Sequence, residues 1–375
     1  MGDNMLKKFT VENYRSFCAP VTIDFTCTRD YQYNTTCVKD GLLSKMIVFG
    51  KNASGKSNLG LALFDIVNVL TDKSDHMLMQ RKRSFQNADC DADTATFTYV
   101  LQRDKDTIHF SYQKTSPNTL VYEELRINDQ LVFTYDFRTQ QNNLHGLEKI
   151  DASTLNFDLF DGDISVLKYI ASNTTQPENS LVRFVMNFVS RMLWFRSLES
   201  NDYIGFTTGA EDLPQWIVEN DYTAEFQRFL HEFAGLDMKL DALKGVDDKA
   251  LLVEVHKNRK LVFLETMSNG TAALMLLFYW HKSFDDVSFL FMDEFDAFYH
   301  FELAYKIIKY VVSLDNVQAV FTTHNTFLAS NNLLRPDCYF MLEAGKLISF
   351  ADSTQRELRE GHNLEKMLRN GEFNG

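Results

Sequence analysis

Alternating apolar and polar residues predict strands in two parts of the chain. The segments Leu6 to Val11 and Val21 to Phe25 alternate on either side of the turn Asn13-Tyr14-Arg15-Ser16-Phe17. From about Thr94 to Phe137 the alternation repeats in several runs, which are separated by turn residues such as Asn128-Asp129. This second region predicts an antiparallel meander.

A different order begins at Met46 to Phe49, an apolar run that predicts a buried strand. The strand leads directly into the loop Gly50-Lys51-Asn52-Ala53-Ser54-Gly55-Lys56-Ser57, and Asn58 to Leu70 then continues with helical periodicity. The local order is therefore strand, glycine loop, helix.

The middle of the chain, residues 150–245, lacks strand-like alternation and contains helical stretches at Asn179 to Trp194 and Tyr222 to Phe233. Strands and helices alternate again after it, which closes an α/β core opened by the first part. The later elements are strands at Leu251 to Val255, Leu261 to Glu265, Val287 to Met292 and Val317 to Thr322, with a helix at Phe301 to Ser313. We predict an α/β fold with an N-terminal lobe (1–149), a helical insertion (150–245) and a C-terminal lobe (246–375).

Composition narrows the class of protein. The 375 residues are 45% hydrophobic and 24% charged, which is ordinary for a globular protein and excludes disorder over most of the chain. The net charge of -13 argues against a protein that coats nucleic acid through general positive charge, although a local basic groove remains open.

The five cysteines form no Cys-x-x-Cys pair, so we expect free thiols in a reducing compartment. No apolar run follows the lysines of Met1 to Thr10, and the longest apolar stretch, Ala272 to Trp280, is far shorter than the roughly 20 residues that span a bilayer. We therefore expect a cytoplasmic location and no membrane-spanning segment.

The loop from Gly50 to Ser57 matches G-x-x-x-x-G-K-[ST] in full, in the strand-to-helix context that this phosphate-binding motif requires. Glycines let the backbone approach phosphate closely, while successive N–H groups and the helix N-terminus face the anion. Lys56 is expected to reach the β- and γ-phosphates, and the Ser57 hydroxyl is expected to bind Mg²⁺. A chance glycine turn is the weaker interpretation.

Two acids follow a second apolar strand, Val287 to Met292. Acids at the carboxyl end of a parallel strand lie where α/β sheets bind ligands. Asp293 would hold the magnesium ion, and Glu294 would polarise the water that attacks the γ-phosphate. Taken alone, the pair could also be a solvated turn.

Two weaker patterns complete the set. His324 follows the strand Ala319 to Thr323 and could contact the γ-phosphate, although a lone histidine is more often structural. Ser268-Asn269-Gly270-Thr271 precedes an apolar helix; it could be simple capping, or a second phosphate-binding helix N-terminus.

Together, Asn13 to Phe17, the phosphate loop, Ser268 to Thr271, Asp293-Glu294 and Thr323-His324 resemble the ABC-type ATPase heads of the RecF, SMC and OLD groups. The chain is most similar to stand-alone AAA-like ATPases of bacterial phage-defence and abortive-infection systems, such as those called RloA-like or AbiL-like. The resemblance covers most of the chain, including the tail from Arg359 to Met367.

The resemblance implies a composite site. Ser268, Asn269, Gly270 and Thr271 would take the place of the ABC signature and cap ATP held by the phosphate loop of a second copy. Asp296 would lie at the seam of that dimer, and Arg15 resembles a residue that approaches the nucleotide. Two departures are Met267 and Thr271, which stand where the usual signature has leucine and glutamine. The Q-loop glutamine is unassigned, with Gln102 and Gln113 as candidates.

The absent parts limit the function that the resemblance implies. The region between the lobes lacks long heptads, and 51 residues follow His324 (375 − 324), so we expect neither a long coiled-coil arm nor a nuclease domain. The leading hypothesis is an ATPase that assembles around ATP and controls a separate effector, such as a nuclease. The alternative is a RecF-like DNA-binding ATPase, with basic clusters at Lys7-Lys8, 80–83 and Lys257 to Lys260.

Overall fold

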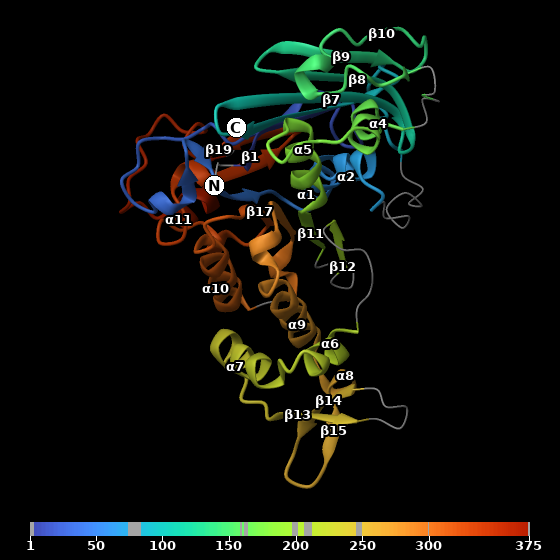
Figure 1. Ribbon diagram of the computed structural model, residues 1–375. Helices are drawn as coiled ribbons and strands as arrows, with labels where there is room; N and C mark the ends of the chain where they lie inside the picture. Colours follow the sequence, from blue (N-terminus) through green and yellow to red (C-terminus); the bar gives the residue numbers. More distant parts are fainter. Residues whose placement is uncertain are drawn as a thin grey trace.

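The computed structural model describes residues 4–73, 84–157, 160, 164–196, 202–205, 212–244, 250–298 and 300–373. Two seven-stranded sheets form the body of the molecule, and an arm extends from it (Figure 1). In the described residues no helix is long and apolar enough to cross a membrane.

The first sheet is antiparallel throughout and confirms the predicted meander. Its burial pattern alternates along each long strand, as expected where one face packs on a core. In spatial order its strands are β10 (Asn142–Asn143), β9 (Gln130–Asp136), β8 (Thr119–Ile127), β7 (Asp106–Ser116), β6 (Ala95–Arg103), β1 (Asn4–Glu12) and β2 (Val21–Asp24).

The second sheet is the core of the α/β fold, and its central five strands are parallel. Those that carry the site, β5, β16 and β17, are buried along their whole length and apolar at most positions, as expected for parallel strands covered on both faces. In spatial order the strands are β12 (Asp202–Gly205), β11 (Met192–Arg196), β16 (Phe289–Asp293), β17 (Gln318–Thr323), β5 (Lys45–Phe49), β18 (Tyr339–Glu343) and β19 (Lys346–Ser349).

Helices α1 and α2 follow β5 (Figure 1). Helix α1 contacts β16 of the core sheet and β1 of the antiparallel sheet, and α2 contacts α4 and α5. Gly60 lets α1 approach the core sheet closely, since a Cβ there would lie 2.7 Å from the Phe291 ring. The helices of the body are α1 (Lys56–Leu63), α2 (Asp65–Leu70), α4 (Val166–Asn173), α5 (Leu181–Ser190), α10 (Phe301–Val312) and α11 (Leu364–Arg369).

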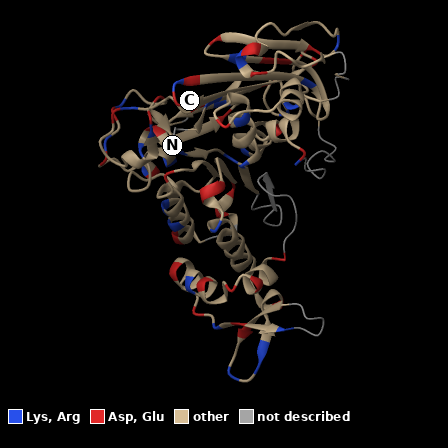
Figure 2. Cartoon of the chain, viewed as in Figure 1, with Lys and Arg blue, Asp and Glu red and all other residues tan. Residues whose placement is uncertain are grey.

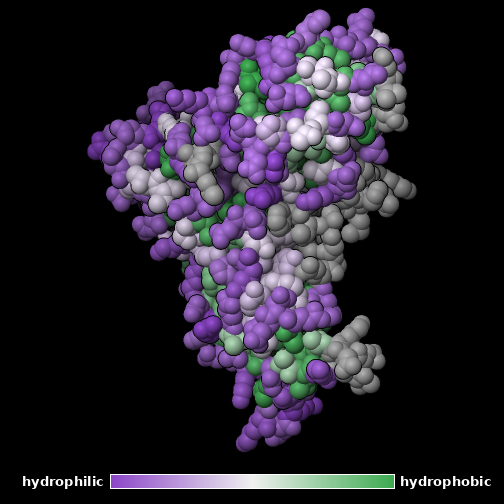
Figure 3. Space-filling model, viewed as in Figure 1, coloured by the Kyte–Doolittle hydropathy of each residue, from purple (hydrophilic) through white to green (hydrophobic). Residues whose placement is uncertain are grey.

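The arm ends in a small three-stranded antiparallel sheet, far from the two large sheets (Figure 1). Apolar surface gathers over its lower part (Figure 3), where Leu243 and Leu264 are exposed. Its elements are α6 (Leu213–Glu219), α7 (Thr223–Ala234), β13 (Leu240–Lys244), β14 (Ala250–Val255), β15 (Lys260–Val262), α8 (Phe263–Thr266) and α9 (Asn269–His281); the short pair β3 (Val38–Lys39) and β4 (Leu42–Leu43) belongs to the body.

Three predicted elements differ from the observed ones. The helix expected to reach Trp194 ends at Ser190, and Met192 begins β11, which pairs in parallel with β16. The helix predicted from Asn58 to Leu70 is interrupted at Phe64. The strand predicted over Leu261 to Glu265 stops at Val262, where α8 takes over. The division into lobes and insertion remains a proposal.

Lys and Arg positions and Asp and Glu positions both occur in the body and in the arm (Figure 2). Among the predicted basic clusters, Lys8 pairs with Asp24 at 2.6 Å and Lys260 pairs with Asp241 at 2.6 Å. The turn between β14 and β15, residues 256–260, is exposed at every position. Positions 80 to 83 lie in a range that the structure does not describe.

A buried ion pair joins the start of α2 to β7 of the antiparallel sheet. The Lys114 ammonium lies 2.9 Å from both carboxylate oxygens of Asp65, and the Tyr112 hydroxyl donates to Asp65 Oδ2 at 3.0 Å. The side chains of Lys114 and Asp65 are 2% and 8% exposed. Removing one partner leaves the other charge buried without compensation.

We expect Lys114→Met to lower the free energy of unfolding by about 3–5 kcal/mol, because Asp65 would stay buried without its cation. Equilibrium unfolding in urea measures this change. The matched control is Lys260→Met, which breaks an exposed pair and should cost less than about 1 kcal/mol. Equal, small losses in both variants would contradict the prediction.

Candidate functional site

The loop from Gly50 to Ser57 leaves the carboxyl end of β5 and begins α1. Ala53 and Gly55 have left-handed backbone conformations, with φ of 65° and 103°. A Cβ at Gly50 would lie 2.5 Å from Ser54 Oγ and 2.9 Å from the Leu342 carbonyl oxygen, so only glycine fits. The loop is thus tightly curled at the N-terminus of α1, where backbone N–H groups and the helix dipole favour an anion.

The Lys56 side chain folds over this loop and is 2% exposed. Its ammonium donates to the carbonyl oxygens of Gly50 at 2.9 Å and Lys51 at 3.1 Å. It also lies 3.5 Å from Glu294 Oε1, at the end of β16. A positive charge is therefore fixed between the loop and the acids of β16.

Thr322 of β17 holds the two acids in place. Its hydroxyl donates to Asp293 Oδ1 at 2.6 Å and accepts from the Glu294 backbone N–H at 2.9 Å. Burial raises the pKa of Asp293, while the Thr322 hydroxyl and the nearby Ser57 hydroxyl oppose this rise.

The backbone of Glu294 is in the left-handed region, with φ of 43°, which is costly for a residue that carries a side chain. The bond from its N–H to Thr322 maintains this conformation. The strained turn directs the chain away from β16 immediately after Asp293, and such strain concentrates at functional sites.

The next threonine, Thr323, makes an equivalent pair of bonds. Its hydroxyl donates to Asp296 Oδ2 at 2.8 Å and accepts from the Asn325 N–H at 2.9 Å. Burial raises the pKa of Asp296. His324, which lies between Thr323 and Asn325 in the sequence, is exposed at the end of β17. The structure thus brings Asp293, Glu294, Asp296 and His324 to one edge of the sheet.

The N-terminal turn packs against the phosphate loop. Asn58 donates from Nδ2 to Ser16 Oγ at 2.9 Å, and a Cβ on Gly55 would lie 2.9 Å from the Phe17 ring. Arg15 has φ of 49°, and its guanidinium carbon lies 5.5 Å from the centroid of the Tyr14 ring. The turn predicted to approach the nucleotide is therefore in contact with the loop.

Ser268 caps helix α9. Its hydroxyl accepts from the Thr271 N–H at 3.1 Å, as the capping interpretation expected. Ser268 and Asn269 are exposed. Within the described residues, no hydrogen bond or ion pair connects the segment from Ser268 through Thr271 with the phosphate loop of the same chain. The loop and this helix start are therefore separate in one chain.

A family model described as "AAA domain, putative AbiEii toxin, Type IV TA system" matches residues 45–330, which is most of the chain. The chain belongs to this family. It is accordingly an ATP-binding ATPase of the AAA type, whose phosphate loop joins β5 of the α/β core sheet to α1.

Three solved structures are similar to this AAA-family chain. They are an Smc head bound to the C-terminal winged-helix domain of ScpA (16% identity, 92% of this chain and 97% of that chain, TM-score 0.45), the SMC head domain from Thermotoga maritima (15%, 90% and 94%, 0.40), and an Smc head domain with an extended coiled coil bound to the C-terminal domain of ScpA from Pyrococcus furiosus (14%, 98% and 98%, 0.45). No curated protein matches the chain.

The side chains present fit a nucleotide and its magnesium ion. Buried atoms without a hydrogen-bond partner include Ser54 Oγ in the phosphate loop, Asp296 Oδ1 beyond the end of β16, and Nε and Nη1 of Arg15, whose turn packs on the loop. An unpaired buried polar atom costs about 1–3 kcal/mol, so a ligand that supplies acceptors at Arg15 and Ser54 is favoured. The Ser57 hydroxyl and Asp293 carboxylate are oxygen donors of the kind Mg²⁺ prefers.

The role of Thr322 and Thr323 could not be found from the sequence. Each is fully buried on β17, and their bonds reach residues 27 to 29 positions away in the chain. The two candidate Q-loop glutamines lie in the antiparallel sheet. The Gln102 side chain donates to the Asp104 carbonyl oxygen, and Gln113 lies on β7, opposite Thr96 of β6 and Tyr122 of β8. These contacts do not include the phosphate loop, so the Q-loop glutamine stays unassigned.

We expect Thr322→Val to slow ATP turnover by about tenfold, because one isosteric change removes the bonds to both Asp293 and the Glu294 backbone. The Mg²⁺ concentration for half-maximal turnover should rise, since Asp293 is no longer oriented. Titration of Mg²⁺ in a phosphate-release assay measures both effects.

The control is Thr322→Ser, which keeps the hydroxyl and should retain most of the turnover and the Mg²⁺ dependence of the wild type. If Thr322→Val lowers the melting temperature and leaves both kinetic quantities unchanged, Thr322 is only a structural residue.

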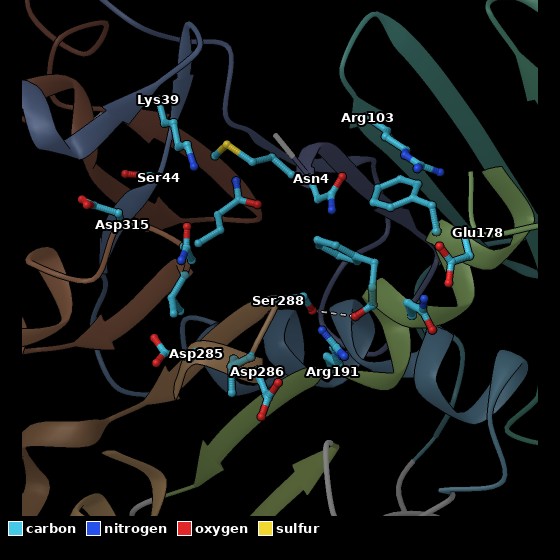
Figure 4. A pocket seen from close by; sticks show the side chains of 18 residues that line it. Asn4, Lys39, Ser44, Arg103, Glu178, Arg191, Asp285, Asp286, Ser288 and Asp315 are labelled. Atoms are coloured by element: carbon cyan, nitrogen blue, oxygen red, sulfur yellow. Dashed lines mark hydrogen bonds between the residues drawn. The ribbon is translucent and has the colours of Figure 1, made fainter. Parts of the chain in front are cut away.

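Two cavities lie at opposite edges of the core sheet. One, of about 770 Å³, borders Gly50 to Ser54, His324 and Arg369 of α11. The other, of about 360 Å³, lies before the amino ends of β16 and β17 (Figure 4). Ligands of open α/β sheets bind at carboxyl ends, so the first edge is the candidate nucleotide face. The second cavity mixes Asp285, Asp286 and Asp315 with Lys39, Arg103 and Arg191.

Proposed function

We propose that two copies of this ATPase assemble around ATP, and that the assembled state controls a separate effector protein in phage defence. The observation that carries this proposal is that Lys56 and Ser57, which follow β5, meet Asp293 and Glu294 at the end of β16. Thr322, on the strand between β5 and β16, holds the two acids in place by hydrogen bonds. Ser268, at the start of α9, is exposed and is therefore accessible to ATP bound to a second copy, which supports assembly of two copies.

Each residue has a distinct proposed role. Lys56 and the loop from Gly50 to Asn58 bind the phosphates, with Arg15 adding a second cation. Ser57 and Asp293 hold Mg²⁺, which neutralises charge on the phosphate oxygens. Glu294 orients the attacking water.

Two further residues are proposed to act where the second copy meets the site. His324 is exposed beside the phosphate loop and is placed to contact the γ-phosphate. Asp296 has one buried carboxylate oxygen without a partner, which a donor from a second copy would satisfy at the seam.

The signature role of Ser268, Asn269, Gly270 and Thr271 requires a second copy, because this helix start makes no bond to its own phosphate loop in the described residues. A two-fold dimer would bring each α9 N-terminus to the other copy's loop. Hydrolysis would then depend on assembly, which gives ATP control over the oligomeric state.

Control of an effector is supported by the family, whose description names a toxin and a toxin–antitoxin system. We infer that the partner is a separately encoded protein such as a nuclease. DNA is the second proposed ligand, supported by the exposed turn that carries Lys257 and Arg259 at the end of the arm.

Mixing two inactive variants tests the composite site. Lys56→Ala disables the phosphate loop and Ser268→Arg blocks the signature, so each alone should lose turnover. A mixed dimer contains one intact loop opposite one intact signature. At equal amounts we expect recovery of about one quarter of the wild-type rate, because half the dimers are mixed and each has one active site.

The result decides between two arrangements. Recovery on mixing supports a signature that acts across the dimer. No recovery, with both variants folded and Ser268→Arg still binding ATP, would contradict it.

A further inference from the structure

Two cysteine thiols lie side by side at the surface of the body. Cys18 ends the N-terminal turn, and Cys90 lies on the segment that leads to β6. The Cys90 sulfur is 3.8 Å from the Cys18 carbonyl oxygen, and the neighbouring Cys90 thiol raises the pKa of Cys18. Cys18 is exposed and Cys90 is partly exposed. The pair is therefore accessible to small reagents.

The backbone around the pair is held by several bonds. Asn13 donates from Nδ2 to the carbonyl oxygens of Ala92 at 2.7 Å and Thr94 at 2.9 Å. Its backbone N–H donates to the Cys18 carbonyl at 3.2 Å, and Asn87 donates to the Arg15 carbonyl at 2.7 Å. These bonds keep the two segments, and hence the two sulfurs, close to each other.

We propose that Cys18 and Cys90 form a site of reversible oxidation, at which a hydroperoxide converts the two thiols into an intrachain disulfide. One thiolate attacks the peroxide oxygen, which gives a sulfenic acid and releases water or an alcohol. The second thiol attacks that sulfur and releases water. Overall two thiols are oxidised by two electrons, one S–S bond forms, and the O–O bond of the peroxide breaks.

The disulfide would act on the surroundings of the phosphate loop. It would close a loop between residues 72 positions apart that contains the whole of Gly50 to Ser57. Ser16 and Phe17, adjacent to Cys18, already contact Asn58 and Gly55. Oxidation would therefore fix the Arg15 turn against the nucleotide face, and it would restrict the unfolded chain.

A second thiol pair in the same chain provides an internal comparison. Cys37 and Cys338 are also neighbours, since each thiol shifts the pKa of the other, but both are fully buried. Because a peroxide cannot reach buried sulfur without local unfolding, this pair should stay reduced. The neighbouring Cys90 thiol and the nearby Asp89 and Asp91 raise the pKa of Cys18, so the exposed pair reacts through a minor thiolate fraction.

The test treats the full chain with one equivalent of hydrogen peroxide and maps disulfides by mass spectrometry of a non-reduced digest. We expect a Cys18–Cys90 linked peptide, a loss of two of the five thiols that dithiothreitol reverses, and a melting temperature higher by about 5 °C. The variants Cys18→Ser and Cys90→Ser should each abolish all three changes.

Other products would overturn the proposal. These are a chain-to-chain disulfide through Cys18, sulfinic acid at Cys18 with Cys90 still reduced, or oxidation of Cys37 and Cys338 before the exposed pair. Unchanged thiols after treatment would also overturn it. None of these readouts depends on ATP turnover.

Discussion

Glu294→Gln is expected to slow ATP hydrolysis by at least about 100-fold and to leave ATP binding nearly unchanged. Glutamine keeps the shape of the side chain and its strained backbone, but its amide cannot accept a proton from water. The side chain would remain beside Lys56, where the wild-type carboxylate lies 3.5 Å from the ammonium. Single-turnover phosphate release separates this loss of chemistry from binding.

The matched control is Glu302→Gln, a change of the same type at an exposed acid in the first turn of α10. It should hydrolyse ATP at the wild-type rate. Turnover in Glu294→Gln that equals this control would remove Glu294 from the proposed role.

Lys56→Ala is expected to weaken ATP binding by about 100-fold. A hydrogen bond to a charged group is worth about 1.5–3 kcal/mol, and the ammonium is placed to contact phosphate oxygens at the start of α1. The change also removes its bonds to the Gly50 and Lys51 carbonyl oxygens, so the melting temperature must be followed beside the affinity. Isothermal titration with ATP and Mg²⁺ measures the affinity.

Lys51→Ala is the control from the same loop. Its side chain is 83% exposed and pairs with Glu343 at 3.4 Å, so its removal should weaken binding far less than the loss of Lys56. Equal losses in the two variants would indicate a general effect of loop charge. Unchanged affinity in Lys56→Ala would contradict a phosphate site at this loop.

Most of the architecture could be predicted from local patterns. The antiparallel meander alternates with period two, and the glycine loop between Phe49 and α1 carries its own motif. Strand β11 could not be predicted, because the apolar run Met192-Leu193-Trp194-Phe195 has no period that separates a buried strand from the end of a buried helix. Its identity depends on pairing with β16, 97 positions later, from Met192 to Phe289.

The candidate site could be predicted from the sequence where neighbouring residues of one segment supply several of its functional side chains. Lys56 and Ser57 belong to the loop motif, and Asp293 and Glu294 are adjacent at the end of β16. Thr322 could not be recognised, since a threonine in an apolar strand is ordinary until its neighbour across the sheet is known. Only the placement of β17 between β5 and β16 shows that its hydroxyl bonds Asp293.

The most direct measurement is the molar mass of the purified chain by light scattering, with and without ATP and Mg²⁺, in the wild type and Glu294→Gln. The account predicts that ATP raises the mass from that of one 43.4 kDa chain to at least about twice that value. The increase should persist in Glu294→Gln and should be absent in Lys56→Ala. A mass that ATP leaves unchanged in both wild type and Glu294→Gln would contradict assembly around the nucleotide.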